Sequence, residues 1–246
     1  MRGLLKITGS YRNDSIMLTH NEIIYNLTEK ILSDCKENSI DIRLFGSVAL
    51  LFLDRAKNGL NGKYRRAVAD IDMIVKPNHI RELENYFLNR GYETDREIKM
   101  LFGNKRRCFY SGNNISIDVF IGNITLCQDI FVLDRFDLSY PTLTPSDLFL
   151  TKIQKINLSD KDVFDIDFIL GFDVDFQYII GLSSKNWNWW KTLTTNIPFL
   201  LKADIGEGSK NLLGGLLFKI ESNRKTMSWG IRNVFGGSLR WYNDVE

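Results

Sequence analysis

The chain has 246 residues, of which 44% are apolar and 25% charged, as in an ordinary globular protein. Its formal net charge of +2 neither requires nor excludes a nucleic-acid partner. No apolar run approaches the roughly 20 residues of a membrane span, and the first residues lack a signal peptide's apolar core. Three scattered cysteines and two histidines give neither a disulfide framework nor a zinc-binding spacing. We therefore expect a reduced, cytoplasmic protein without a membrane partner; the oligomeric state stays open.

The first clear period in the sequence is helical. Thr19 followed by Glu22 has the spacing of a capping box, and apolar residues then recur at helical intervals. This pattern predicts a helix from His20 to about Lys36, preceded by a leader without a clear period.

A strand, a turn and a helix follow. Residues 40–45 alternate as a strand does, and residues 48–53 form an apolar run typical of a buried helix. Gly46 and Ser47 lie between them. Glycine lets the backbone approach a ligand closely, and the free N–H groups at a helix start favour phosphate oxygens. Many turns carry such a pair, so the pair alone is weak evidence for phosphate contact.

An acidic pair opens the next apolar run, residues 70–75. In a strand, Asp70 and Asp72 project from one face about 6.5–7 Å apart. Two such acids repel each other unless a cation lies between them or one is protonated. The pair on its own fits a solvated strand end as well as a metal site.

A third acid interrupts a later strand. Before it we expect a helix from about Asn78 to Arg90, strand-like pieces over 92–100 and 106–110, and a turn at 111–114. In the strand over 115–121, Asp118 shares a face with Ser116 and Phe120. An unpaired acid is costly to bury. Asp118 therefore either faces water or joins Asp70 and Asp72 around a metal.

Gly46-Ser47, Asp70-Ile71-Asp72 and Asp118 within Ile117-Asp118-Val119 together resemble the nucleotidyltransferase superfamily, which shares the DNA polymerase β-type catalytic fold. The resemblance is closest to minimal and abortive-infection toxin-type members and covers roughly residues 40–171. The loop between Ser47 and Asp70 is longer here than in minimal members, which bears on the placement of Arg65 and Arg66.

Two lysines extend the resemblance. Thr144-Pro145-Ser146-Asp147 predicts a helix start, and Lys152 and Lys155 then lie one turn apart on that helix. Together with the later run 161–165, Leu150-Thr151-Lys152 looks like the lysine and Lys-Asp-x-x-Asp signatures of the abortive-infection group, in which a helix lysine contacts the triphosphate. Lys152 is the better match and Lys155 the second candidate. The alternative for both is a solvated helix face.

A second Asp-Ile-Asp sequence, residues 165–167, must be separated from the first. Ser159 with Asp162 forms a capping-box spacing that predicts a helix here. Residues two apart on a helix point about 200° apart, so this pair cannot share a cation. We interpret it as structural, with Asp162 and Asp165 orienting a lysine.

All five tryptophans lie beyond Phe172, interleaved with basic residues toward the end of the chain. Such interleaving serves base stacking and phosphate contact in RNA binders. More often, aromatic residues at this density form the core of a small helical domain or its seam with another. We expect helical stretches at 176–182, 186–195 and 211–222.

The expected fold is α/β (α+β): a nucleotidyltransferase-like mixed sheet with flanking helices over residues 1–143, and a helical domain over 144–246 that completes the nucleotide cleft. The resemblance implies Mg²⁺- or Mn²⁺-dependent transfer of a nucleoside monophosphate from an NTP to an acceptor hydroxyl on RNA, tRNA, a protein or a small molecule. The alternative is a non-catalytic binding or regulatory module, resembling an antitoxin or a scaffold. The residues that the resemblance assigns to catalysis and metal binding are Asp70, Asp72 and Asp118, and those assigned to substrate binding are Gly46, Ser47, Arg66, Lys152 and Lys155.

Overall fold

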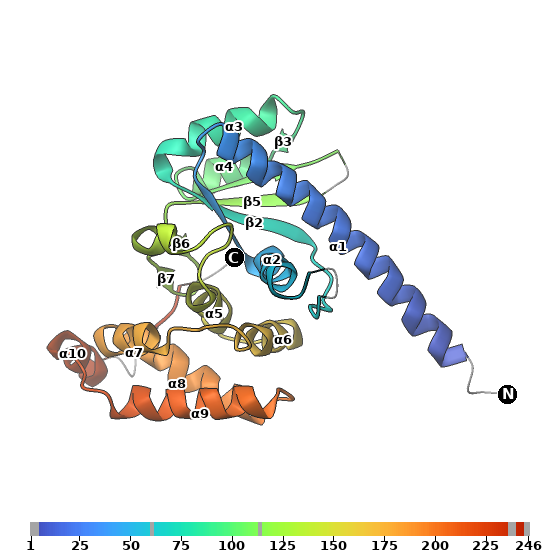
Figure 1. Ribbon diagram of the computed structural model, residues 1–246. Coiled ribbons are helices and arrows are strands. Elements are labelled where there is room, and N and C mark those ends of the chain that lie inside the picture. The colour runs from blue at the N-terminus through green and yellow to red at the C-terminus, as the bar shows by residue number, and fades with distance from the viewer. Residues whose placement is uncertain (1–4, 60–61, 113–114, 236–239, 244–246) are drawn as a thin grey trace. The chain divides into compact units, whose positions relative to one another are not determined.

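The computed structural model describes residues 5–59, 62–112, 115–235 and 240–243 (Figure 1). Its contacts divide the chain into two units. The first consists of Met1–Gly122 with Ser139–Thr142, and the second of Asn123–Leu138 with Leu143–Glu246. The fold is α+β, as the sequence predicts. The segment Asn123–Leu138, which precedes the expected boundary at residue 143, belongs to the helical second unit.

The first unit is built on a mixed five-stranded sheet with the strand order β1-β2-β5-β4-β3. β2 and β5 are parallel, and every other neighbouring pair is antiparallel. At the start of the central strands β2 and β5, half-buried residues alternate with buried ones. These buried residues share one face of the sheet, and that face is apolar throughout. The strands are β1 (Ile42–Phe45), β2 (Asp70–Val75), β3 (Glu93–Thr94), β4 (Arg106–Tyr110) and β5 (Ser116–Ile121).

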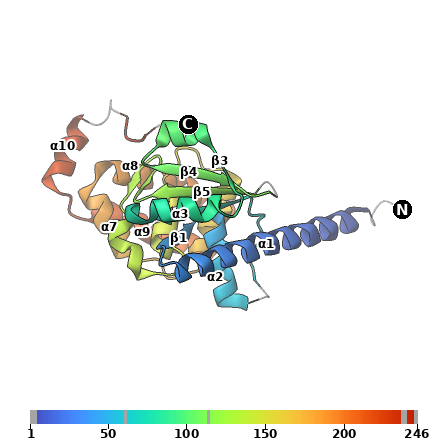
Figure 2. The ribbon, with the colours of Figure 1, turned by 90° about the horizontal axis from the view of Figure 1, so that it is seen from above.

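Four helices accompany this sheet: α1 (Leu5–Glu37), α2 (Gly46–Asn58), α3 (Ile80–Leu88) and α4 (Arg96–Phe102). Helices α1 and α3 lie side by side in both views (Figures 1 and 2), and the hydroxyl of Tyr86 donates to Asp34 at 2.9 Å. Phe87 of α3 stacks on Phe109 of β4 with ring centroids 4.6 Å apart. These contacts cover the apolar face of the sheet and leave the opposite face to the acids.

Two expectations for this unit are wrong. Helix α1 begins at Leu5, so Thr19 lies inside it and the capping-box spacing with Glu22 does not mark its start. Those residue types also occur within helices, and spacing alone cannot separate the two cases. The strand expected over 92–100 ends at Thr94, because Asp95 accepts from the amides of Glu97 and Ile98 and begins α4.

The second unit is helical apart from one short hairpin. The predicted helix starts are confirmed: Thr144 caps α5, and Ser159 and Asp162 form the capping box of α6. Trp187 and Trp189 are buried in this unit, as expected for core residues. The hairpin and the last helix lie outside the predicted elements. The elements are β6 (Ile124–Thr125), β7 (Asp129–Ile130), the 3-10 helix Leu133–Leu138, α5 (Pro145–Ile153), α6 (Asp160–Ile169), α7 (Phe176–Lys185), α8 (Trp187–Lys202), α9 (Glu207–Ser222) and α10 (Met227–Phe235).

Candidate functional site

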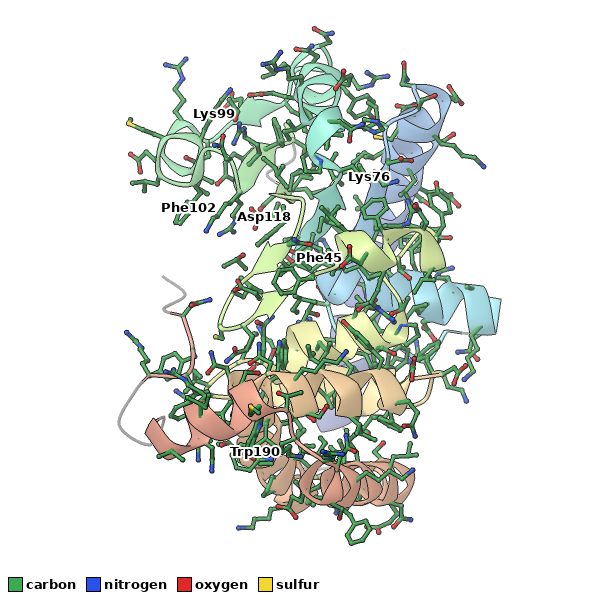
Figure 3. All side chains as sticks on the ribbon, turned by 90° about the vertical axis from the view of Figure 1, so that its left-hand side faces the viewer. Phe45, Lys76, Lys99, Phe102, Asp118 and Trp190 are labelled. Atoms are coloured by element: carbon green, nitrogen blue, oxygen red, sulfur yellow. The ribbon has the colours of Figure 1, made fainter. Side chains whose placement is uncertain are left out.

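Three aspartates lie on one face of the sheet in the first unit. Asp72 of β2 is directly opposite Asp118 of β5 in the parallel register, and Asp70 is opposite Ser116. Since side chains alternate along a strand, Asp70, Asp72 and Asp118 project to the same side. We call these three residues the acid face. Phe45 continues the row across β1, because it pairs with Asp72 on the other side; Figure 3 labels Phe45 and Asp118, which lie on either side of Asp72 in this row.

Gly46 brings the start of α2 against this face. Its φ of +65° lies in the left-handed region, where a side chain is strained. A Cβ atom at this position would lie 1.9 Å from Oδ2 of Asp72, so only glycine fits. The start of α2 thus packs directly against the carboxylate of Asp72.

Ser47, the second residue of α2, is 4% exposed. Phe45 precedes the helix without a side-chain capping bond, so the helix start is formed by the glycine turn rather than by a capping side chain. A phosphate contact by the Ser47 hydroxyl therefore stays a prediction.

Arg106 of β4 holds the third acid. Its Nη2 donates to Oδ2 of Asp118 at 2.8 Å, and its Nε donates to Oδ1 at 3.3 Å. Burial alone would lower the pKa of Arg106, but the hydrogen bonds and charge of Asp118 outweigh it, and the charge of Asp72 acts in the same direction. The pKa of Arg106 is therefore raised, and Asp118 is neutralised by a fixed guanidinium.

The thiol of Cys108 is a further neighbour of Asp118. Cys108 is opposite Asp118 in the antiparallel register of β4 and β5, and its Sγ lies 3.9 Å from Oγ of Ser116. Burial raises the pKa of this thiol, and the charge of Asp118 raises it further. Because the thiolate is the form that binds metals and attacks electrophiles, Cys108 is a neutral neighbour of the acid face.

The acid face fits magnesium by the chemistry of its donors. Mg²⁺ prefers oxygen ligands and is commonly held by one or two carboxylates together with substrate phosphates. Within the described part of the chain, no three or more His, Cys, Asp or Glu side chains form a ready metal-binding group. Carboxylates of Asp70 and Asp72 would suffice with a triphosphate, whereas Asp118 is engaged by Arg106.

Two buried side chains fix the backbone of residues 63–68, which precede β2. Asp54 of α2 accepts from the amides of Lys63 at 2.9 Å and Tyr64 at 2.8 Å. Asn21 of α1 donates to the carbonyl of Arg66 at 3.0 Å and accepts from the amide of Val68 at 2.9 Å. The Nε of Arg66 donates to the hydroxyl of Tyr64 at 3.1 Å. The backbone of Arg66 is thus well positioned, and its assignment to substrate binding stays a prediction.

In the second unit, the two candidate lysines each bind an aspartate of α6. Nζ of Lys152 lies 2.8 Å from Oδ2 of Asp165, whose side chain is 0% exposed, and Nζ of Lys155 lies 2.6 Å from Oδ1 of Asp162. The prediction that these aspartates orient lysines is confirmed. Lys152 is only 12% exposed, so it does not lie on a solvated helix face. Asp167, the last residue of the second Asp-Ile-Asp sequence, accepts from the amide of Gly206 at 3.2 Å, which fits a structural role.

The sequence interpretation missed Arg106. A signal was present: the antiparallel pairing of β4 with β5 sets Arg106 opposite Phe120, which places Arg106 and Asp118 diagonally on one face; part of the turn predicted at 111–114 lies outside the described residues. Reading the two predicted strands together, rather than one at a time, would have found the pair.

In comparisons with known proteins, no protein-family model and no curated protein matches this chain. Among the helices of the described ranges, none combines the length and apolar character that crossing a membrane requires.

Proposed function

We propose that the chain is a metal-dependent nucleotidyltransferase that moves a nucleoside monophosphate from an NTP to an acceptor hydroxyl. The observation that carries this proposal is the pairing of Asp72 with Asp118 on adjacent parallel strands, with Asp70 on the same face and the Gly46 backbone against the Asp72 carboxylate. These are the residues on which the resemblance to the nucleotidyltransferase superfamily rests.

Each residue has a defined part in the proposed reaction. Asp70 and Asp72 hold Mg²⁺ together with oxygens of the triphosphate. When bound, magnesium neutralises charge on the triphosphate and stabilises the attacking and leaving oxygens. The acceptor oxygen forms a bond to the α-phosphorus, the bond from that phosphorus to the bridging oxygen breaks, and pyrophosphate leaves. Asp118 would complete a second metal site, and it takes the proton of the acceptor hydroxyl.

The remaining candidates act on the phosphates in this proposal. Gly46 allows backbone N–H groups to approach the β- and γ-phosphates, and the Ser47 hydroxyl adds a donor. Arg66 supplies positive charge to the nucleotide. Lys152 and Lys155 belong to the second unit, and their assignment to the nucleotide stays a prediction from the sequence resemblance.

Label transfer tests the proposal. The full chain is incubated with Mg²⁺ and each NTP labelled at the α-phosphate, together with total RNA or with fractionated lysate. We expect label in one macromolecular or small-molecule fraction with the wild type and with Asp41→Asn, a matched control whose carboxylate is 47% exposed and pairs with Lys76. Asp118→Asn should lose transfer but keep its fold. Transfer at the wild-type rate by Asp118→Asn would contradict the role of Asp118, and label in no fraction would contradict the proposed reaction.

A non-catalytic module is the second candidate, and one observation favours it. The ion pair of Arg106 with Asp118 neutralises an acid that the reaction needs. For a binding module, nucleotides with Mg²⁺ should leave the unfolding temperature unchanged, and no label should be transferred. A nucleotide-dependent rise in that temperature together with label transfer would rule this candidate out.

A further inference from the structure

Arg106 already supplies a positive charge to Asp118. Both oxygens of the carboxylate are engaged, at 2.8 Å and 3.3 Å, by two nitrogens of the same guanidinium. The side chain of Asp118 is 14% exposed and that of Arg106 is 30% exposed, so water screens the pair only in part. A planar guanidinium matches a carboxylate in this fork-like geometry, and such charge-assisted pairs are among the stronger hydrogen bonds in proteins.

The position of Arg106 is fixed by more than this one acid. Arg106 is opposite Phe120 in the register of β4 and β5, and its guanidinium carbon lies 5.4 Å from the centroid of the Phe120 ring. The charge of Asp72, a neighbour of Asp118 across the strands, also acts on it. The guanidinium therefore sits over the acid face, where a divalent cation bound by Asp118 would have to be.

We infer, on the basis of the proposed function, that Arg106 prevents divalent cations from binding to Asp118 as long as its guanidinium stays on the carboxylate. A guanidinium and a divalent cation repel each other and compete for the same two oxygens. Giving up charge-assisted hydrogen bonds of this strength weakens cation binding by roughly tenfold to a hundredfold. Arg106 is thus a positioning residue that controls metal occupancy at Asp118, and it takes no part in the chemical step.

Binding of Mn²⁺ alone tests this inference without nucleotide. The free ion is followed by electron paramagnetic resonance during titration of the full chain. We expect Arg106→Gln to bind Mn²⁺ roughly ten to a hundred times more tightly than the wild type, and the gain to disappear in Arg106→Gln with Asp118→Asn. Arg107→Gln is the matched control: it removes the same charge from the next residue of β4, where Arg107 bonds to the carbonyl of Arg106 at 3.0 Å rather than to an acid.

Stability measurements guard against a variant that does not fold. Mn²⁺ should raise the unfolding temperature of Arg106→Gln more than that of the wild type. Arg106→Lys, which keeps the charge but loses the fork geometry, should show a smaller gain in Mn²⁺ affinity and serves if the glutamine variant unfolds. Equal Mn²⁺ affinity of wild type and Arg106→Gln would overturn the inference, as would an equal gain in Arg107→Gln.

Label transfer by the same proteins separates the inference from the proposed function. Transfer by the wild type with no gain in Mn²⁺ affinity in Arg106→Gln would refute the inference alone. A gain in affinity with no transfer by any protein would support control of the metal site by Arg106 and refute the proposed reaction.

Discussion

Replacing Gly46 by alanine tests whether the start of α2 is built against the acid face. Alanine meets two separate penalties at this position. The φ of +65° costs an L-residue roughly 1–2 kcal/mol. The new methyl group would lie 1.9 Å from Oδ2 and 2.7 Å from Cγ of Asp72, an overlap that forces side chain or backbone to move at a cost of about 1–3 kcal/mol.

The sum, roughly 2–5 kcal/mol, is a large part of the 5–15 kcal/mol by which domains are typically stable. Urea unfolding followed by far-UV circular dichroism measures this loss. Because all five tryptophans lie beyond Phe172, tryptophan fluorescence recorded in parallel reports on the second unit. We expect Gly46→Ala to lower the urea concentration at the midpoint of the first unit's unfolding transition, as followed by circular dichroism.

Gly91 provides the matched control. Its φ is +77°, and a Cβ atom there would meet nothing within 4 Å, so Gly91→Ala carries the backbone penalty alone. Asp72→Ala removes the two closest atoms, and in that background Gly46→Ala should cost about 1–3 kcal/mol less. Equal losses for Gly46→Ala and Gly91→Ala, or an unchanged cost in the Asp72→Ala background, would refute the contact between Gly46 and Asp72.

Three further predictions concern the buried charges. Lys152→Met should destabilise the second unit by about 3–5 kcal/mol, because it leaves the buried carboxylate of Asp165 without its cation; tryptophan fluorescence during urea unfolding measures this, and a change of the size seen at surface sites would contradict it. Burial raises the pKa of Asp162, but hydrogen bonds from Lys155 and Ser159 outweigh it and lower the pKa. The folded state therefore binds a proton less readily than the unfolded state, and stability is lost as the pH falls below about 4. Asp162→Asn should weaken this loss of stability at acid pH in unfolding curves recorded over a series of pH values. Asp54→Ala leaves two backbone amides without an acceptor and should cost roughly 1–3 kcal/mol for each, measured by urea unfolding with far-UV circular dichroism; a stability within error of the wild type would show that water replaces the carboxylate.

The placement of Asp70 and Asp72 on one face could be predicted because it depends on local rules. Alternation along a strand places Asp70 and Asp72 on one face, and the uninterrupted apolar residues after them identify a central strand. The cap of α5 at Thr144 and the capping box of α6 follow from equally local spacings. In each case the residues that decide the structure lie within one turn or one strand of each other.

Features that depend on distant contacts were not predicted. The assignment of Asn123–Leu138 to the second unit rests on contacts such as the ion pair of Arg135 with the buried Asp147, at 3.0 Å. Neither partner of that pair identifies the other by spacing in the sequence.

The same difference between local patterns and distant contacts applies to the candidate site. The shared face of Asp70 and Asp72 follows from the sequence pattern, whereas the placement of Asp118 opposite Asp72 is expected only from the resemblance. The sequence predicts that Asp165 orients a lysine, and Asp165 binds Lys152, whereas Arg106, the partner of Asp118, is not among the predicted site residues. Charge pairing across elements is a property of register and helix packing, which single-element patterns do not contain.

Unfolding temperature in the presence of Mg²⁺ and each NTP tests most directly whether the acid face binds a metal–nucleotide complex. A ligand present at 100 times its Kd adds about 2.7 kcal/mol to the stability of the state that binds it. We predict a concentration-dependent rise with at least one NTP for the wild type and for Asp41→Asn, and no rise for Asp70→Asn combined with Asp72→Asn. No rise with any NTP, or an equal rise in the double variant, would contradict the account.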